Sequence, residues 1–163
     1  MHILLTRNLE DSKDLILKFK SNGFKVSNIP LLEIGKINHN EIKLNNFNAI
    51  IFTSSNAIRF LDLKRIDKNI LCFCVGSSTE KTARSNGFQR VYAADGNVRN
   101  LKELIQQNLS AKFNKIIYVS GEFISYPLDR ELTSEGYNVE RLINYSVKHN
   151  ENLNLSFLKS LKK

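Results

Sequence analysis

Short apolar runs alternate along the whole chain with stretches that carry apolar residues at helical spacing. The apolar runs have the length of β-strands and span residues 2–6, 25–34, 48–53, 70–75, 90–94, 115–120 and 138–147. The stretches between them predict helices over residues 11–22, 55–63, 78–86, 98–109 and 127–135. Regular alternation of strand and helix predicts the α/β class with a mostly parallel sheet.

One phrase recurs where a predicted helix gives way to a strand. Each of its three copies places a glycine before an aromatic residue, and the glycines are Gly23, Gly87 and Gly136. A glycine just past a helix end adopts the left-handed conformation without steric cost. We therefore expect these glycines to end helices rather than to contact a ligand.

Four predicted strands lead into short loops made largely of Gly, Ser, Thr and Asn. The loops span residues 53–56, 76–79, 95–97 and 120–122. Such residues cap helix N-termini well, and Ser77 with Glu80 has the spacing of a capping box. The loops of a parallel sheet gather outside the carboxyl ends of its strands, where helix N-termini offer free N–H groups and partial positive charge. The sequence therefore predicts a donor-rich rim that suits several carboxylates or phosphates.

The charge balance favours anionic partners. The 163 residues include 24 Lys and Arg against 16 Asp and Glu, a formal net charge of +8. The basic residues are scattered without interleaved aromatics, so we expect no nucleic-acid partner. No apolar run is long enough to span a membrane, so we expect no membrane partner either. Neither GxGxxG nor GxxxxGK[ST] occurs, which removes the main support for nucleotide binding.

Few side chains suggest metal or nucleophilic chemistry. Cys72 and Cys74 lie two residues apart in one predicted strand, which fits a reducing cytoplasm better than a disulfide scaffold. The histidines lie outside the loops, and no cluster with metal-ligand spacing occurs, so we expect no metal site. Tyr145 lies in the last apolar run, and its phenol is able to donate a proton to a leaving group.

Several short segments share their order and spacing with those of one enzyme family. They are Ile3-Leu4-Leu5-Thr6-Arg7, Ile29-Pro30-Leu31 with Ile34, Ile51-Phe52-Thr53-Ser54-Ser55-Asn56-Ala57-Ile58, Val75-Gly76-Ser77-Ser78-Thr79, Gly87-Phe88, Gly96-Asn97 with Leu101, Ser120-Gly121, and Tyr145. This collinear set extends from residue 1 to about residue 147 and resembles the uroporphyrinogen-III synthase family.

The resemblance implies a bilobed protein in which each lobe is a flavodoxin-like α/β unit and two extended strands join the lobes. Residues 1–34 with 148–163 would form part of the first lobe, and residues 35–147 the second lobe with the connecting β-ribbon. The family's chain continues for some tens of residues beyond the end of this sequence, so we expect an incomplete first lobe. Exposed apolar surface would then make the lone chain aggregate or dimerise, whereas the family implies a monomer.

The resemblance also implies an activity. Members of the family are cytoplasmic lyases of tetrapyrrole and haem biosynthesis. They cyclise the polycarboxylate hydroxymethylbilane to uroporphyrinogen III, with loss of water and inversion of ring D, and need no metal or organic cofactor. The preceding enzyme, hydroxymethylbilane synthase, would be a partner that hands over the substrate.

The matching positions imply roles for individual residues. Tyr145 matches the family's tyrosine and would assist departure of the hydroxyl group. The positions expected to bind substrate carboxylates are Arg7, Thr53, Ser54, Ser55, Gly76, Ser77, Thr79, Gly96, Asn97, Ser120 and Gly121.

Two alternatives remain open from the sequence. The chain could be a truncated, non-catalytic remnant of the family that retains weak tetrapyrrole binding. It could also be an unrelated flavodoxin-like module that binds a phosphorylated or carboxylated small molecule.

Overall fold

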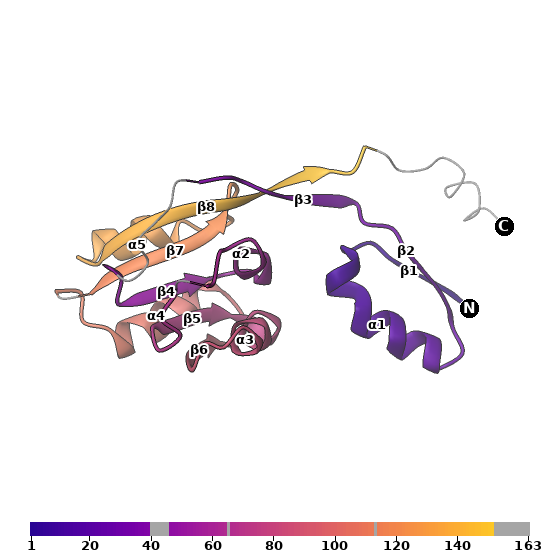
Figure 1. Cartoon of the computed structure of the whole chain (residues 1–163), viewed down its shortest axis with the longest axis horizontal. Coiled ribbons are helices and arrows are strands. Elements are labelled where there is room, and N and C mark those ends of the chain that lie inside the picture. The colour runs from indigo at the N-terminus through magenta and orange to yellow at the C-terminus, as the bar shows by residue number, and fades with distance from the viewer. Residues whose placement is uncertain (40–45, 65, 113, 152–163) are drawn as a thin grey trace. The chain divides into compact units, whose positions relative to one another are not determined.

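The chain separates into two compact units in the computed structural model, which describes residues 1–39, 46–64, 66–112 and 114–151. Unit 1 comprises Met1–Gly35 and Val147–Lys163, and unit 2 comprises Lys36–Ser146. Residues 152–163, expected in the first lobe, lie outside the described residues. Strands and helices alternate along the chain and confirm the α/β class (Figure 1).

Unit 2 is built around a mostly parallel sheet. Its strands are β3 (Leu32–Lys36), β4 (Ala49–Phe52), β5 (Leu71–Val75), β6 (Arg90–Ala94), β7 (Lys115–Gly121) and β8 (Asn138–His149), in the order β3-β8-β7-β4-β5-β6. β4 pairs in parallel with β5 and β7, β5 with β6, and β7 with β8. Both β3 and β8 cross the boundary between the two units. The Ile37 N–H donates to the Asn144 carbonyl and the Asn150 N–H to the Leu31 carbonyl, each at 2.9 Å, so these two strands run in opposite directions.

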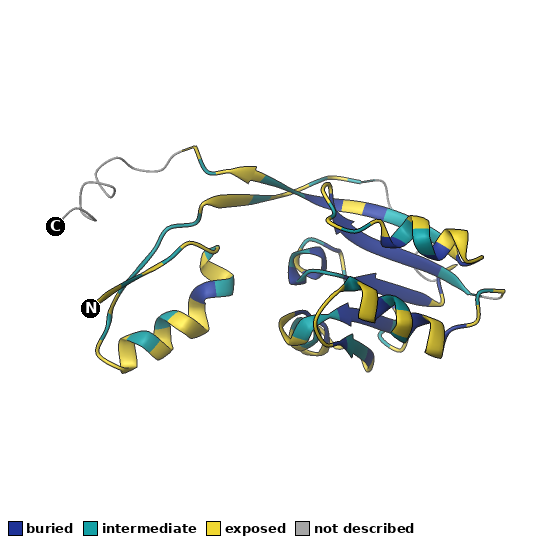
Figure 2. Cartoon of the chain, turned by 180° about the vertical axis from the view of Figure 1, so that it is seen from behind, coloured by how far each residue is buried: buried dark blue, intermediate teal, exposed yellow. Residues whose placement is uncertain are grey.

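Helices cover both faces of this sheet. α2 (Ser55–Arg59) packs with α3 (Gly76–Ser85), and α4 (Val98–Asn108) packs with α5 (Leu128–Ser134). Alternate strand residues join α4 and α5 in one core, which includes Ala49, Ile51, Phe73, Ile116, Leu101, Ile105, Leu128 and Leu132. The intervening strand residues are also buried, and the Phe52 ring lies 5.7 Å from that of Phe88. Burial on both faces explains why these strands form unbroken apolar runs in the sequence (Figure 2).

The three recurring glycines end helices as predicted. Gly23, Gly87 and Gly136 have φ values of 80°, 92° and 92°, in the left-handed region. In the first copy, the Gly23 N–H donates to the Lys20 carbonyl and the Phe24 N–H to the Phe19 carbonyl, both at 3.0 Å. The other two copies repeat this pair of bonds, which is the Schellman pattern. The aromatic residue after each glycine then packs against the helix or the core.

Unit 1 has a small secondary-structure framework. Strands β1 (His2–Leu5) and β2 (Lys25–Asn28) pair in parallel, and α1 (Leu9–Ser21) links them. The Asn28 Nδ2 donates to the carbonyls of Leu5 at 3.1 Å and Arg7 at 2.9 Å. Several large apolar side chains of this unit remain exposed, namely Met1, Leu4, Leu9, Leu15, Leu17, Leu31 and Leu32.

Two predicted elements differ clearly from the observed ones. The predicted strand over residues 25–34 is two strands, because the chain changes its pairing partner around Pro30: β2 pairs with β1, whereas β3 neighbours β8. The helix predicted over residues 55–63 is shorter, and α2 ends at Arg59.

Candidate functional site

The four loops singled out in the sequence follow strands that all point the same way. Phe52 at the end of β4 lies opposite Cys74 of β5 and Val119 of β7. Val75 at the end of β5 lies opposite Ala94 of β6. Parallel pairing therefore brings residues 53–56, 76–79, 95–97 and 120–122 to one side of the sheet, which we call the carboxyl edge.

The carboxyl edge has a topological switch point between β4 and β7. These strands are neighbours, but β4 leads through α2 to β5, whereas β7 leads through α5 to β8. Ligands of open α/β sheets bind in the crevice that such a divergence creates. Thr53 lies at this point, and its Oγ1 is 3.1 Å from the phenol oxygen of Tyr118. Burial raises the pKa of Tyr118, while the hydrogen bond with Thr53 and the charge of Arg141 act in the opposite direction.

The loop after β4 uses its serines to start α2. Ser54 is the N-cap residue, and its hydroxyl accepts a hydrogen bond from the Asn56 N–H at 3.2 Å. Ser55 is the first helical residue and is buried. This loop therefore presents Thr53 and Ser54 at the edge, with the Ser54 oxygen partly engaged by its own helix.

The start of α3 is uncapped by any side chain. The helix begins at Gly76, whose φ is +76°, and its N-cap residue is Val75. The predicted capping box of Ser77 and Glu80 is wrong, because Ser77 already lies inside the first turn and not at the N-cap position. The backbone N–H groups of that turn donate to no capping side chain. Ser77 is exposed and Thr79 is buried beside them.

The start of α4 is capped in the expected way. Asn97 is the N-cap residue, and its side-chain oxygen accepts from the N–H groups of Arg99 at 2.8 Å and Asn100 at 3.3 Å. Gly96 precedes it with a φ of 100°, a conformation that a side chain would strain.

β7 includes Ser120, as the predicted strand did, and continues to Gly121, which was expected in the loop. An arginine that the sequence analysis did not single out holds them in place. The Arg141 guanidinium donates from Nε to Ser120 Oγ at 2.8 Å, and from Nη2 to the carbonyls of Gly121 at 2.8 Å and Glu122 at 2.9 Å. A cation within the apolar run of residues 138–147 is the sequence signal for Arg141, whereas its place opposite Tyr118 follows from the strand register of the structure.

Tyr145 packs against the end of β7. It lies opposite Gly121 in the register, at a bulge between the two strands, and is 8% exposed. A Cβ atom on Gly121 would lie 2.7 Å from two carbons of the Tyr145 ring, which is too close for any side chain. The ring of Phe60 lies 6.4 Å away, and the Tyr145 carbonyl accepts from the Glu122 N–H at 2.9 Å. The position of this phenol therefore depends on a glycine at residue 121.

Asn144 is the buried polar neighbour of Tyr145. It is fully buried, and its Nδ2 donates to the Ala57 carbonyl of α2 at 2.7 Å. Its Oδ1 has no hydrogen-bond partner among the described residues. Asn144 thus ties β8 to the helix that follows Thr53 and Ser54.

The cysteines lie in the core instead of at the carboxyl edge. Cys72 and Cys74 are free and fully buried, with their Sγ atoms 3.7 Å apart. Hydrogen bonding to Cys74 and burial raise the pKa of the Cys72 thiol, which leaves it protonated and unreactive. Among the described ranges, no group of three or more His, Cys, Asp or Glu residues could hold a metal ion.

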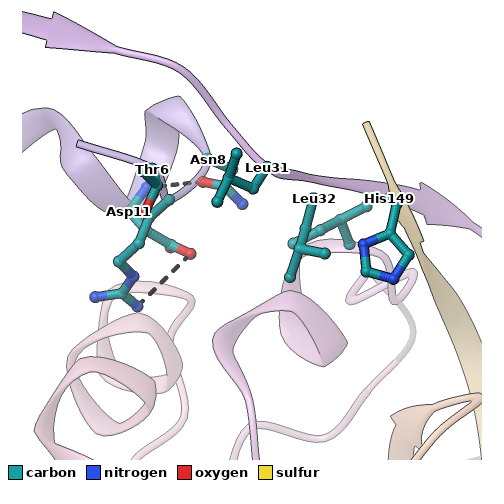
Figure 3. Close-up of a pocket in the computed structure, with 8 residues that line it drawn as sticks. Thr6, Asn8, Asp11, Leu31, Leu32 and His149 are labelled. Carbon is teal, nitrogen blue, oxygen red and sulfur yellow. Dashed lines mark hydrogen bonds and ion pairs between the residues drawn. The ribbon is translucent and has the colours of Figure 1, made fainter. Parts of the chain in front are cut away.

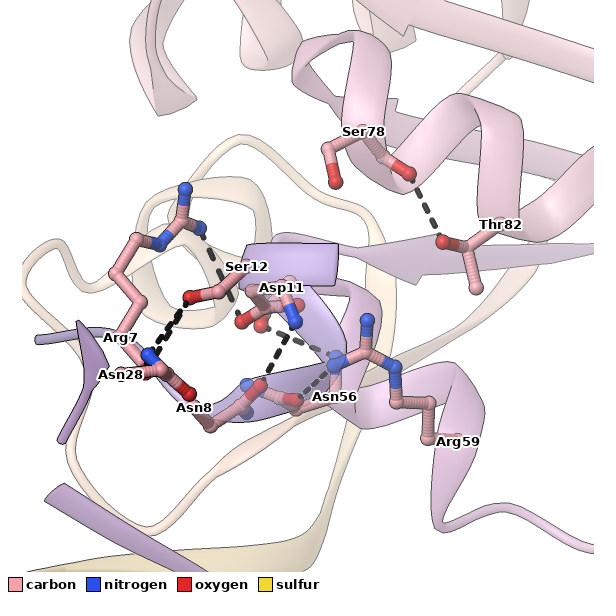
Figure 4. A network of polar contacts seen from close by, with 10 residues as sticks. Arg7, Asn8, Asp11, Ser12, Asn28, Asn56, Arg59, Ser78 and Thr82 are labelled. Carbon is pink, nitrogen blue, oxygen red and sulfur yellow. Dashed lines mark hydrogen bonds and ion pairs between the residues drawn. The ribbon is translucent and has the colours of Figure 1, made fainter. Parts of the chain in front are cut away.

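Arg7 belongs to unit 1, unlike the other candidate residues. Its side chain is 67% exposed and lies 3.9 Å from the Asp11 carboxylate (Figure 4). It lines a cavity of about 420 Å³ within unit 1, together with Thr6, Asn8, Asp11, Leu31, Leu32, Ile34 and His149 (Figure 3). The Asn8 side chain caps α1 through the Asp11 N–H at 2.9 Å, so this Asp11 backbone group is already engaged.

The fold is similar to that of known uroporphyrinogen-III synthases. The structure is similar to a uroporphyrinogen-III synthetase from Helicobacter pylori (TM-score 0.60, 21% identity), with 99% of this chain and 68% of that chain covered. It is also similar to a mutant uroporphyrinogen III synthase from Thermus thermophilus (TM-score 0.55, 14% identity), with 92% and 64% covered. This chain therefore spans about two thirds of the length of those two proteins.

The amino-acid sequence matches a family model. No curated protein matches the chain. No helix in the described segments is both long and apolar enough to cross a membrane. The family model described as uroporphyrinogen-III synthase HemD matches residues 13–163, which is most of the chain. The chain therefore belongs to the uroporphyrinogen-III synthase family.

Proposed function

We propose that this chain is a uroporphyrinogen-III synthase, which cyclises hydroxymethylbilane to uroporphyrinogen III with inversion of ring D. Its family membership supports this activity. The observation that carries the proposal is the carboxyl edge, where four loops rich in small polar residues follow parallel strands. Such an edge can hold a polycarboxylate through backbone N–H groups and hydroxyls.

Different parts of the carboxyl edge would bind substrate carboxylates in different ways. The uncapped first turn of α3 offers backbone N–H groups, and Ser77 adds an exposed hydroxyl beside them. Thr53 and Ser54 add hydroxyls at the switch point. Gly96 and Asn97 at the start of α4 extend the edge beyond β6. The net charge of +8 favours the approach of a polyanion to all of these groups.

Ser55, Thr79, Ser120 and Gly121 would act mainly by shaping the edge. All four are buried, and the Ser120 hydroxyl and the Gly121 carbonyl already bond to Arg141. Their small size lets a bulky ligand approach the backbone. They contribute space and rigidity, while the neighbouring N–H groups provide the hydrogen bonds.

Tyr145 would assist the departure of the substrate hydroxyl. In this step the phenol donates its proton to the hydroxyl oxygen as the C–O bond breaks, and the oxygen leaves as water. The Tyr145 side chain is 8% exposed and its ring packs beside Gly121 at the end of β7, where the phenol would meet a substrate held at the carboxyl edge. Cyclisation then depends on how the bound chain is held, because only one orientation of the last ring gives the inverted product.

We further propose the lobe organisation expected from the sequence, with residues 1–34 and 148–163 in the first lobe and 35–147 in the second. The two compact units support this division. Arg7 would then be the first lobe's contribution to carboxylate binding. We also propose a cytoplasmic location and direct transfer of the substrate from hydroxymethylbilane synthase. The exposed apolar residues of unit 1 would allow the chain to self-associate.

An isomer assay tests the proposal. The chain is incubated with freshly prepared hydroxymethylbilane, and the uroporphyrinogen isomers are separated after oxidation. We expect type III to exceed the type I that forms spontaneously. A chain that binds uroporphyrinogen but yields only type I would be a non-catalytic remnant of the family. Thermal protection by phosphate compounds, without protection by uroporphyrinogen, would favour a module for another polyanion.

A further inference from the structure

The loop that leaves β7 carries an exposed aromatic ring at the carboxyl edge. Phe123 is 79% exposed and is the only aromatic side chain among the exposed large apolar residues of the described part of the chain. It stands two residues after Gly121, the residue against which Tyr145 packs. An apolar ring is thus exposed to solvent in the segment that follows the residue on which the proposed catalytic tyrosine packs.

The backbone that carries Phe123 is held on both sides. Before it, the Arg141 guanidinium binds the carbonyls of Gly121 and Glu122 at 2.8 and 2.9 Å, and the Glu122 N–H donates to the Tyr145 carbonyl at 2.9 Å. After it, Ile124 and Tyr126 pack against the core of unit 2. Phe123 is therefore exposed on an anchored loop, because the residues on both sides of it have defined contacts.

The remaining loops of the carboxyl edge supply polar groups, in contrast to the apolar ring of Phe123. Residues 53–56, 76–79 and 95–97 offer hydroxyls, amides and backbone N–H groups, which suit carboxylates. A tetrapyrrole precursor also has flat, electron-rich pyrrole rings, which need an apolar or aromatic surface. Aromatic rings pair favourably in offset-stacked or edge-to-face arrangements. The exposed ring of Phe123 can provide such a surface.

We propose that Phe123 is a substrate-binding residue whose ring stacks on a pyrrole ring of the bound tetrapyrrole, with Arg141 as the residue that positions its loop. This inference rests on the proposed function and deepens it. The carboxylate-binding loops would fix the charged side arms of the ligand, while Phe123 would fix the plane of one ring. The plane of a pyrrole ring matters for this reaction because the product depends on how the last ring is oriented.

Binding of uroporphyrinogen III under anaerobic conditions tests the inference without requiring turnover. Calorimetric titration of the unmodified chain is compared with Phe123→Ala, Phe123→Leu and Phe123→Tyr. We expect Phe123→Ala to raise the Kd about tenfold and Phe123→Leu to raise it by less. Phe123→Tyr, which keeps the aromatic face, should restore the Kd to within about twofold of the unmodified value. Leu17→Ala removes a similarly exposed apolar side chain from α1 and serves as the control, with an unchanged Kd.

A Phe123→Trp variant gives a direct spectroscopic readout, because the natural chain contains no tryptophan. Its emission should change in intensity and wavelength on saturation with uroporphyrinogen III. Unchanged emission, or a Phe123→Ala variant that binds as tightly as the unmodified chain, would overturn the inference and leave the proposed function intact. Absence of uroporphyrinogen binding by the unmodified chain would overturn both. If Phe123→Ala binds hydroxymethylbilane synthase more weakly than the unmodified chain and binds uroporphyrinogen equally well, the ring belongs to a protein interface instead.

Discussion

The absence of a side chain at Gly121 allows the Tyr145 ring to occupy its position. Gly121 is not among the glycines with positive φ, so its backbone conformation does not require a glycine. The reason for a glycine at this position is therefore the Tyr145 ring, whose carbons would lie 2.7 Å from a Cβ atom. A packing requirement in β7 is in this way coupled to the position of a proposed catalytic group in β8.

The substitution Gly121→Ala should destabilise the protein by about 1–3 kcal/mol, because the added methyl overpacks a buried contact. Urea unfolding measures this loss. In a Tyr145→Ala background the same substitution should cost much less, since the ring that it meets has been removed. Equal costs in the two backgrounds would show that Tyr145 is not the residue that excludes a side chain at position 121.

The substitution Tyr145→Phe removes one oxygen and leaves the packed ring in place. Because the ring stays packed beside Gly121 and Phe60, the free energy of unfolding should change by no more than about 1 kcal/mol. Turnover of hydroxymethylbilane to the type III isomer should fall by about 100-fold or more if the phenol acts as the proton donor. Measured turnover equal to that of the unmodified chain would remove Tyr145 from the mechanism.

At the scale of elements, α4 and α5 are joined by a charged network of half-buried side chains. The Lys102 Nζ lies 2.8 Å from a carboxylate oxygen of both Glu131 and Glu135. These contacts hold the pKa of each carboxyl below its ordinary value of 4.5 and raise the pKa of Lys102. The Tyr126 hydroxyl also donates to Glu131, so the network includes the segment that leads into α5.

The substitution Lys102→Met should make stability less sensitive to acid. A carboxyl whose pKa is lowered by folding contributes stability above its unfolded pKa of about 4.5 and loses that contribution as the pH falls through the folded pKa. Thermal unfolding between pH 7 and pH 3 should therefore show a shallower fall in Tm for Lys102→Met than for the unmodified chain. Lys112→Met, at an exposed position before β7, is the control and should leave the slope unchanged. Parallel slopes for all three proteins would contradict the proposed linkage.

The elements differ in how far the sequence could predict them. Strands β4, β5 and β7 are buried on both faces, so each is an unbroken apolar run that is easy to recognise. The Schellman ends were predictable because a glycine before an aromatic residue has one dominant local role. The start of α3 was not, because Gly76 lets the helix begin directly at the end of β5, a choice that depends on tertiary packing.

The candidate site shows the same division between local and non-local information. The order of the loops along the chain, together with parallel pairing, was enough to predict that they would share one edge. The bonds from Arg141 to Ser120 and Gly121 depend on strand register, which no local pattern encodes. The packing of Tyr145 on Gly121 depends further on a bulge between β7 and β8, so neither contact could be predicted from spacing alone.

At the scale of the whole molecule, the two units differ in how much they bury. Every residue of β4 is buried, as is nearly all of β7, whereas β1 alternates between exposed and half-buried positions. In α1 the one buried residue is Ser12, and Leu17 and Leu9 are exposed. Local stability follows the number of buried apolar contacts, so unit 1 should open at a lower free energy than unit 2.

Amide hydrogen exchange at residue resolution measures this difference in the intact chain. The N–H groups of α1 and β2 should exchange at least about tenfold faster than those of β4, β5 and β7, because unit 1 can open without exposing the core of unit 2. The substitution Ile51→Ala, in the core under α4, should accelerate exchange in β4, β5 and β7 and leave α1 nearly unchanged. Equal protection in α1 and β4, or a uniform response to Ile51→Ala, would mean that the two units unfold as one cooperative body. Separate responses would mean that the carboxyl edge of unit 2 stays formed while unit 1 opens, so that the substrate-binding loops can remain structured through fluctuations of the rest of the chain.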